Sequence, residues 1–269
     1  MSYLFLAVPP YSGSTVLHNY IAKCANVTPL TDEIRSKNST NEAGIIEGNA
    51  ATNARKLYGD RGVDGVRIAP GARMPIIQNQ TNYDWDGIKT FLDANWQQNT
   101  TNPNASIRLQ KTPNDTYRVQ MMQPHFDANW IIMVREPYAW VQSTIEKFLA
   151  KGINPSGSAQ EIVDHMVNTY VIQKENQAFL GDKAYTMTFE DFVTNEDKHT
   201  QALKDWMPEL SDLTFKGDCK VKRERVQGLT NNNAERVALL RTVPGAINKF
   251  NELFKPHEAV LNSWGYELL

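Results

Sequence analysis

The segment that most constrains the fold is residues 3–17, which read YLFLAVPPYSGSTVL. An apolar run with the length of a strand is followed by a turn rich in Pro, Ser, Gly and Thr, and then by a helical pattern. Gly13 lets the backbone come close to a ligand, and the start of the helix presents N–H groups and the positive end of its dipole. This order of strand, loop and helix predicts an anion site, for which phosphate or sulfate is the natural ligand.

The loop lacks the features of a nucleotide-triphosphate loop, whose pattern is G-x-x-x-x-G-K-[ST]. Gly13 is followed by Ser14 and Thr15 with no lysine, and Val8 stands where the first glycine would be. ATP or GTP hydrolysis is therefore disfavoured. An ordinary turn is the alternative interpretation, since Pro, Ser and Gly are common turn residues.

Residues 129–148, which read NWIIMVREPYAWVQSTIEKF, form a second strand-to-helix segment. The apolar run Trp130–Val134 predicts a parallel strand that is buried on both faces and ends at Arg135. Pro137 suits the first turn of a helix, and Ser143 lies across that helix from its apolar stripe. The stripe consists of Val141, Ile145, Phe148 and Leu149.

Arg135 is placed to meet an anion. Ligands of open parallel sheets bind beyond the carboxyl ends of the strands, and a guanidinium binds phosphate as a fork. The alternative is an ion pair of Arg135 with Glu136 or Asp127 at the start of the helix.

The rest of the chain alternates between strand and helix patterns, which predicts an α/β fold with a parallel β-sheet flanked by helices. The further elements expected are a helix over 85–97, strands over 107–109 and 184–189, a long helix opening at a Ser158–Glu161 capping box, and a helical C-terminal third broken at Pro208, Pro244 and Pro256. No linker divides the chain, so we expect a single domain over residues 1–269. The weakly patterned residues 26–84 are expected to form substrate loops.

Composition narrows the function classes. The chain has 28 basic and 30 acidic residues, a net charge of −2, so a nucleic-acid or anionic-membrane surface is not indicated. Cys24 and Cys219 lack C-x-x-C spacing, and Cys24 is expected to be a buried thiol on the first helix. The five histidines show no metal-ligand spacing, so no metal is expected. The N-terminal apolar run is too short for a signal peptide or membrane anchor, which predicts a soluble, cytoplasmic protein.

Together these segments resemble the sulfotransferases that use 3′-phosphoadenosine 5′-phosphosulfate (PAPS), in particular the tyrosylprotein-like and general bacterial branch. PPYSGSTVL resembles the 5′-phosphosulfate loop, usually written P-[KR]-[ST]-G-[ST]-[ST]. VREPYAWVQS resembles the 3′-phosphate segment, in which an Arg ends a strand and a Ser follows eight positions later. QKTP at residues 110–113 is similar to a K-[ST]-P stretch, MTFEDFV at 187–193 to the Y-E-D-[LFM] element, and the final NSWGYELL to a common ending of that branch.

The resemblance implies a P-loop-type sheet and in-line transfer of a sulfuryl group from PAPS to an acceptor hydroxyl or amine, with 3′-phosphoadenosine 5′-phosphate (PAP) as product. The cofactor-binding residues that it implies are Tyr11, Ser12, Gly13, Ser14, Thr15, Arg135 and Ser143, with Arg223 and Arg225 in a basic cluster where the family has a mobile covering loop. No metal is required by this chemistry. The acceptor would be a small molecule, a carbohydrate or a peptide, and neither its identity nor the oligomeric state can be read from the sequence.

Two positions depart from the family pattern. Family loops usually carry Lys or Arg where this chain has Tyr11, and that cation neutralises charge during transfer. Lys111, which matches the lysine of K-[ST]-P, is the candidate for the active-site cation. Phe189 replaces the Tyr of Y-E-D, which removes a hydroxyl and keeps the packing.

An acceptor hydroxyl also needs a base. In the tyrosylprotein-like branch it is a carboxylate shortly after the first helix, and ungapped counting places it at Asp32, with Glu33 adjacent. The competing candidates are His18, Glu42 and Glu47, and the alternative for each acidic residue is a solvated loop charge.

Two other function classes stay open. A P-loop nucleotide or sugar kinase predicts magnesium-dependent nucleotide turnover, against which the missing Gly-Lys pair argues. A catalytically silent PAPS- or PAP-binding protein is suggested by Tyr11.

Overall fold

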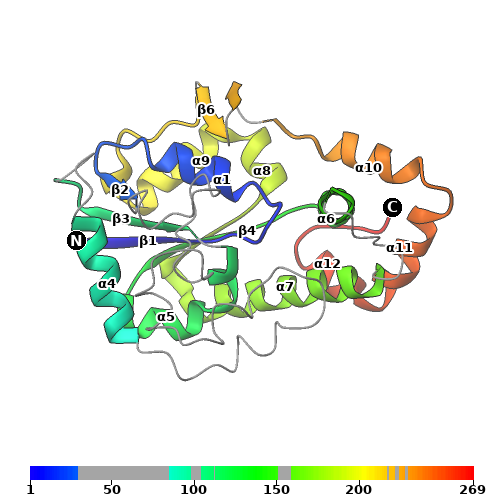
Figure 1. Ribbon diagram of the computed structural model, residues 1–269, viewed down its shortest axis with the longest axis horizontal. Coiled ribbons are helices and arrows are strands. Elements are labelled where there is room, and N and C mark those ends of the chain that lie inside the picture. Colours follow the sequence, from blue (N-terminus) through cyan, green and yellow to red (C-terminus); the bar gives the residue numbers. More distant parts are fainter. Residues whose placement is uncertain are drawn as a thin grey trace.

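The computed structural model describes residues 1–29, 85–97, 104–111, 113–150, 159–216, 218–221, 224–227 and 230–269. At its centre is an all-parallel sheet of five strands in the order β2-β3-β1-β4-β5 (Figure 1). The strands are β1 (Ser2–Ala7), β2 (Val27–Pro29), β3 (Ile107–Lys111), β4 (Asn129–Val134) and β5 (Ala184–Thr188). The predicted α/β fold with a parallel sheet flanked by helices is confirmed.

Helices cover both faces of the sheet (Figure 1). One face carries α1 (Ser14–Ile21), α8 (Phe189–Thr194) and α9 (Glu196–Trp206), and the other carries α4 (Trp85–Gln97), α5 (Val119–Phe126) and α7 (Ala159–Leu180). Short 3₁₀ turns occur at Pro113–Tyr117, Gly181–Lys183, Pro208–Leu210 and Lys255–His257. Within the described ranges, each helix is too short or too polar to span a membrane.

Successive side chains of β1 enter two separate cores. Leu4 and Leu6 pack with the residues of α1, α8 and α9, whereas Tyr3, Phe5 and Ala7 pack with those of α4, α5 and α7. Because neighbouring residues of a strand point to opposite faces, a continuously apolar strand has to be covered on both sides. β1 is therefore held rigidly in the middle of the sheet, and the loop that follows it starts from a fixed point.

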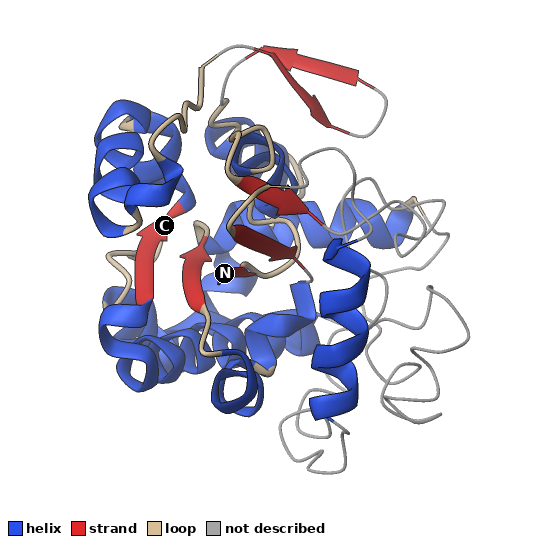
Figure 2. Cartoon of the chain, turned by 90° about the vertical axis from the view of Figure 1, so that its left-hand side faces the viewer, coloured by secondary structure: helices blue, strands red, loops and turns tan. Residues whose placement is uncertain are grey.

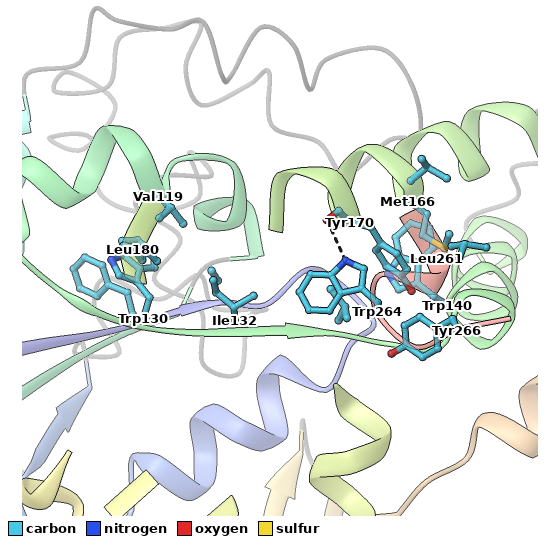
Figure 3. Close-up of a cluster of buried hydrophobic side chains, with 14 of the residues drawn as sticks. Val119, Trp130, Ile132, Trp140, Met166, Tyr170, Leu180, Leu261, Trp264 and Tyr266 are labelled. Atoms are coloured by element: carbon cyan, nitrogen blue, oxygen red, sulfur yellow. Dashed lines mark hydrogen bonds between the residues drawn. The ribbon is translucent and has the colours of Figure 1, made fainter. Parts of the chain in front are cut away.

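The C-terminal helices lie beyond one end of the sheet, beside α6 (Figure 1). The elements of this region are α6 (Pro137–Leu149), α10 (Asn233–Arg241), α11 (Ala246–Phe254) and α12 (Glu258–Asn262). The end of the chain then returns to α7, where Trp264 and Tyr266 pack on Tyr170 and the indole N–H of Trp264 donates to the Tyr170 carbonyl at 3.2 Å (Figure 3). The closing segment is thus part of the core.

Several local expectations are confirmed. The helix over 85–97 has the predicted bounds. Cys24 is 4% exposed, and burial raises the pKa of its thiol to about 12, as fits a structural cysteine. It lies in the turn after α1 rather than on the helix, because α1 ends at Ile21.

Other expectations need correction. A hairpin of β6 (Asp218–Val221) and β7 (Glu224–Gln227) interrupts the helical C-terminal third and stands apart from the main sheet (Figure 2). β5 ends at Thr188 rather than at Phe189, because the Thr188 hydroxyl accepts from the Asp191 amide and starts α8. Leu149 is 58% exposed rather than part of the buried stripe, because it is the last residue of α6.

Candidate anion-binding site

The two predicted anion segments lie side by side. β1 and β4 are hydrogen-bonded neighbours with parallel register from Leu4 opposite Asn129 to Ala7 opposite Ile132. Their carboxyl ends therefore meet at the same edge of the sheet, and Nη1 of Arg135 donates to the carbonyl oxygen of Tyr11 at 2.7 Å. This edge is where open parallel sheets bind ligands.

The loop after β1 has the geometry of an anion cradle. Gly13 is the N-cap of α1, with φ 82° in the left-handed region that favours glycine. Helix geometry leaves the amides of Ser14 and Thr15 without partners inside α1, so they are available to an anion at its positive end. The Ser12 amide instead donates to the Pro9 carbonyl at 3.3 Å, which confines the cradle to the residues after it.

The loop is anchored from α6. The indole Nε1 of Trp140 donates to the Pro10 carbonyl at 2.7 Å, and the Trp140 ring packs edge-on against Tyr11. Tyr11 has a φ of 63°, which is uncommon for a residue other than glycine. Tyr11 therefore occupies the position where the resembled loops carry a cation. Its ring packs on Trp140, and its backbone carbonyl faces Arg135.

The side chain of Phe189, the first residue of α8, contacts both segments. A Cβ added to Gly13 would lie 2.7 Å from ring carbons of Phe189, so the loop backbone rests directly on this ring. The guanidinium of Arg135 lies over the same ring, 4.9 Å from its centroid. One aromatic side chain thus fixes both the glycine turn and the arginine.

Lys111 brings a cation to the loop. It ends β3 opposite Leu6 of β1 and is 1% exposed. Its Nζ lies 3.4 Å from Oγ1 of Thr15. The predicted active-site cation therefore reaches the start of α1 from a neighbouring strand.

Arg135 is buried and bound by neutral acceptors. Its side chain donates from Nε to Oδ1 of Asn233 and from Nη2 to Oδ1 of Asn232, each at 2.7 Å, besides the bond to Tyr11. The residue is 6% exposed, and burial lowers the pKa of its guanidinium from the usual value. Neither Glu136 nor Asp127, the two alternative partners weighed from the sequence, is bonded to it among the described residues.

Two acidic residues, Glu136 and Glu190, lie near Arg135 and act on its charge. Glu136 caps α6 by accepting from the amides of Tyr138 and Ala139, and burial raises the pKa of its carboxyl to about 7. Glu190 accepts from the Glu136 amide at 2.9 Å, from the Tyr266 hydroxyl at 2.7 Å and from Nδ2 of Asn233. The carboxylate of the F-E-D segment therefore ties together the end of β4, the start of α10 and the C-terminal segment.

The remaining predicted site residues either make no side-chain contact with the loop or Arg135 that the structure shows, or lie outside the described ranges. Ser143 is 7% exposed and lies in the second turn of α6. The same helix is joined to α10 by an ion pair between Glu146 and Arg236. Of the basic cluster, Arg225 lies in β7, where only the backbone is described. Arg223 and the candidate bases Asp32, Glu33, Glu42 and Glu47 lie outside the described residues. His18 is buried in α1, with Nδ1 3.5 Å from Oδ1 of Asn19.

The structure also brings in residues that the sequence analysis did not select. Asn232 and Asn233 accept from Arg135, and Trp140 donates to the loop carbonyl of Pro10. Glu190 does not contact Arg135 directly but accepts from Asn233. Glu190 was visible as part of the F-E-D match, whereas the asparagines carried no signal, since the contact of Arg135 with Asn233 joins positions 98 apart in the sequence.

A separate cavity of about 460 Å³ lies between α6, α7, α10 and α11. Its walls are mostly apolar and include Ile145, Ile162, Leu240 and Phe250. None of its lining residues belongs to the loop or contacts Arg135, so it is distinct from the anion site.

Comparison with known proteins supports the fold. No protein-family model matches the chain, and no curated protein matches it in sequence. A sulfotransferase from Alicyclobacillus acidocaldarius has a similar structure, with a TM-score of 0.54 and 13% identity over 98% of this chain and 95% of that chain. This similarity shows a sulfotransferase-like fold.

Two further solved structures are more distant. The sulfotransferase domain from the curacin biosynthetic pathway has a TM-score of 0.48 and 14% identity over 89% of this chain and 97% of that one. Sulfotransferase STF9 from Mycobacterium avium has a TM-score of 0.47 and 13% identity over 98% of this chain and 77% of that one.

Proposed function

We propose that this chain is a PAPS-dependent sulfotransferase that moves a sulfuryl group to an acceptor hydroxyl or amine by in-line displacement. The observation that carries the proposal is the meeting of the β1 loop and Arg135 at one edge of the sheet, joined by the bond from Arg135 to Tyr11. A ligand with two separate anionic groups, such as PAPS, suits this arrangement. The sulfotransferase-like fold agrees with it.

The residues present fit such a ligand. At one end, the Ser14 and Thr15 amides and hydroxyls, after the Gly13 turn, would hold the 5′-phosphosulfate. At the other end, Arg135 and Ser143 would hold the 3′-phosphate, which distinguishes PAPS from an adenylate without that group. Bound PAPS supplies the sulfuryl group, and the chain supplies its position and electrostatic environment.

Lys111 is the residue proposed to stabilise charge during transfer. Charge spreads over the sulfuryl oxygens and the bridging oxygen, so a fixed cation close to the loop lowers the barrier. With its ammonium 3.4 Å from Thr15 Oγ1, Lys111 can replace the missing cation at Tyr11. The lysine is held in the interior, where its charge acts with little screening by water.

The acceptor is proposed to be a small molecule, a carbohydrate or a peptide, bound by loops within residues 26–84. The base that takes its proton is proposed to be Asp32 or Glu33, with His18, Glu42 and Glu47 as the other candidates. We propose a cytoplasmic location for the protein.

Calorimetry with PAP tests the cofactor assignment. The proposal expects PAP to bind at micromolar concentration, whereas ATP with magnesium does not bind. Binding of ATP–Mg without binding of PAP would instead support a nucleotide or sugar kinase. Transfer of labelled sulfate from PAPS to a panel of sugars, phenols and peptides then separates an enzyme from a silent binding protein.

A further inference from the structure

We infer that Asn233 is a positioning residue of the anion site, which keeps the charge of Arg135 available to a phosphate by separating Arg135 from Glu190. The inference rests on the proposed function, because it adds a residue to that same site.

Asn233 stands between the two charged groups. Its Oδ1 accepts from Nε of Arg135 at 2.7 Å, and its Nδ2 donates to Oε1 of Glu190. The opposite amide orientation would set a donor against Arg135 and an acceptor against Glu190. Since Arg135 and Asn233 are 6% and 7% exposed, this relay is enclosed by protein and its orientation is fixed.

Glu190 is bound without Arg135. Besides Asn233, the amide of Glu136 and the hydroxyl of Tyr266 donate to its two oxygens. In the part of the chain that the structure describes, Arg135 makes no ion pair. This is notable because a buried arginine and a nearby carboxylate readily form a bidentate pair. Such a pair would have to be broken before a phosphate could use the guanidinium.

The acceptors on Arg135 are all neutral and can be exchanged for a charged one. The guanidinium has five N–H groups, and Asn232, Asn233 and the Tyr11 carbonyl accept from three of its nitrogens. A phosphate oxygen makes a shorter and stronger bond to a guanidinium than an amide oxygen does. Asn232 is only half-buried, so its place on Nη2 is the one that an incoming phosphate can take, while Asn233 stays as the spacer.

The experiment measures PAP affinity by calorimetry for the full chain and four variants. Asn233→Ala removes the spacer and lets Glu190 approach Arg135, so PAP affinity should fall at least about tenfold. Adding Glu190→Gln to Asn233→Ala removes the competing charge and should restore affinity to within about threefold of wild type. Asn248→Ala, at an exposed position of α11, is the control and should bind PAP as wild type does.

Asn233→Asp covers the case in which Asn233→Ala does not fold. It keeps the size of the side chain and places a carboxylate directly on Nε of Arg135, so PAP affinity should again fall at least about tenfold. Wild-type PAP affinity in folded Asn233→Ala or Asn233→Asp, or no recovery in the double variant, would overturn the inference while leaving the proposed function intact. A wild-type chain that fails to bind PAP would overturn both.

Discussion

At the residue scale, Gly13 meets a backbone requirement and a packing requirement at once. Its φ of 82° favours glycine, and its missing side chain leaves room for the Phe189 ring. Gly13→Ala should therefore lower the free energy of unfolding by about 2–4 kcal/mol, through backbone strain and overpacking together, and should weaken PAP binding. Urea unfolding and calorimetry measure the two effects.

Gly245 offers a matched control for this prediction. It is also a helix N-cap with a left-handed φ, of 74°, and a Cβ added there would meet nothing within 4 Å. Gly245→Ala should thus cost only the backbone strain, about 1–2 kcal/mol, and leave PAP binding unchanged. Equal destabilisation by the two substitutions would refute the argument from the Phe189 contact.

Lys111 gives a second prediction at this scale. Lys111→Met keeps most of the side-chain volume and removes a buried charge, so the fold should be retained. If Lys111 acts in the transition state, the rate of sulfate transfer should fall by about a hundredfold or more while PAP affinity changes by less than about tenfold. Steady-state kinetics and calorimetry on the same preparation compare the two, with Lys183→Met at an exposed ion pair as control. Equal losses of rate and stability would make Lys111 structural.

At the element scale, the start of α6 couples helix capping to a titrating group. Glu136 caps the helix, and burial raises its carboxyl pKa from 4.5 to about 7. Because the folded chain then holds a proton that the unfolded chain has lost, the free energy of unfolding should fall as the pH rises from about 4.5 to 7. Glu136→Gln should reduce this fall by about 1–3 kcal/mol, after allowance for partial solvent exposure.

Urea unfolding at pH 5 and at pH 7.5 tests that slope. Glutamine keeps one of the two oxygens that cap the helix, so the variant should remain folded at both values. If Glu136→Gln and the wild type lose the same free energy of unfolding between pH 5 and pH 7.5, Glu136 does not titrate in this range.

Also at the element scale, local patterns predicted the two strand-to-helix units well. β1 and β4 are continuous apolar runs, and the helices that follow them begin after Gly13 and at Pro137, whose intrinsic preferences need no tertiary contact. The β6–β7 hairpin was missed because each strand has only four residues, and β7, with the sequence ERVQ, does not alternate between apolar and polar side chains. Leu149 was wrongly predicted to be buried, because helical periodicity does not show at which residue the protein that packs on the helix ends.

At the scale of the whole molecule, the order of the strands brings the residues of the candidate site together. β3 and β4 flank β1, so Lys111, the β1 loop and Arg135 converge although they are far apart in the sequence. Sequence patterns do not reveal such order, because it depends on pairing between distant segments. For the same reason the sequence indicated Gly13, Lys111 and Arg135 as site residues but did not indicate Asn233. Asn233 reaches Arg135 only because α10 packs beside the end of β4 in the folded chain.

A crystal structure of the chain with bound PAP would show whether both phosphates bind at this edge of the sheet. We expect the 5′-phosphate at the Ser14 and Thr15 amides and the 3′-phosphate on the Arg135 guanidinium, with the adenosine spanning the ends of β1 and β4. PAP bound elsewhere, or with only one phosphate at this edge of the sheet, would contradict this expectation.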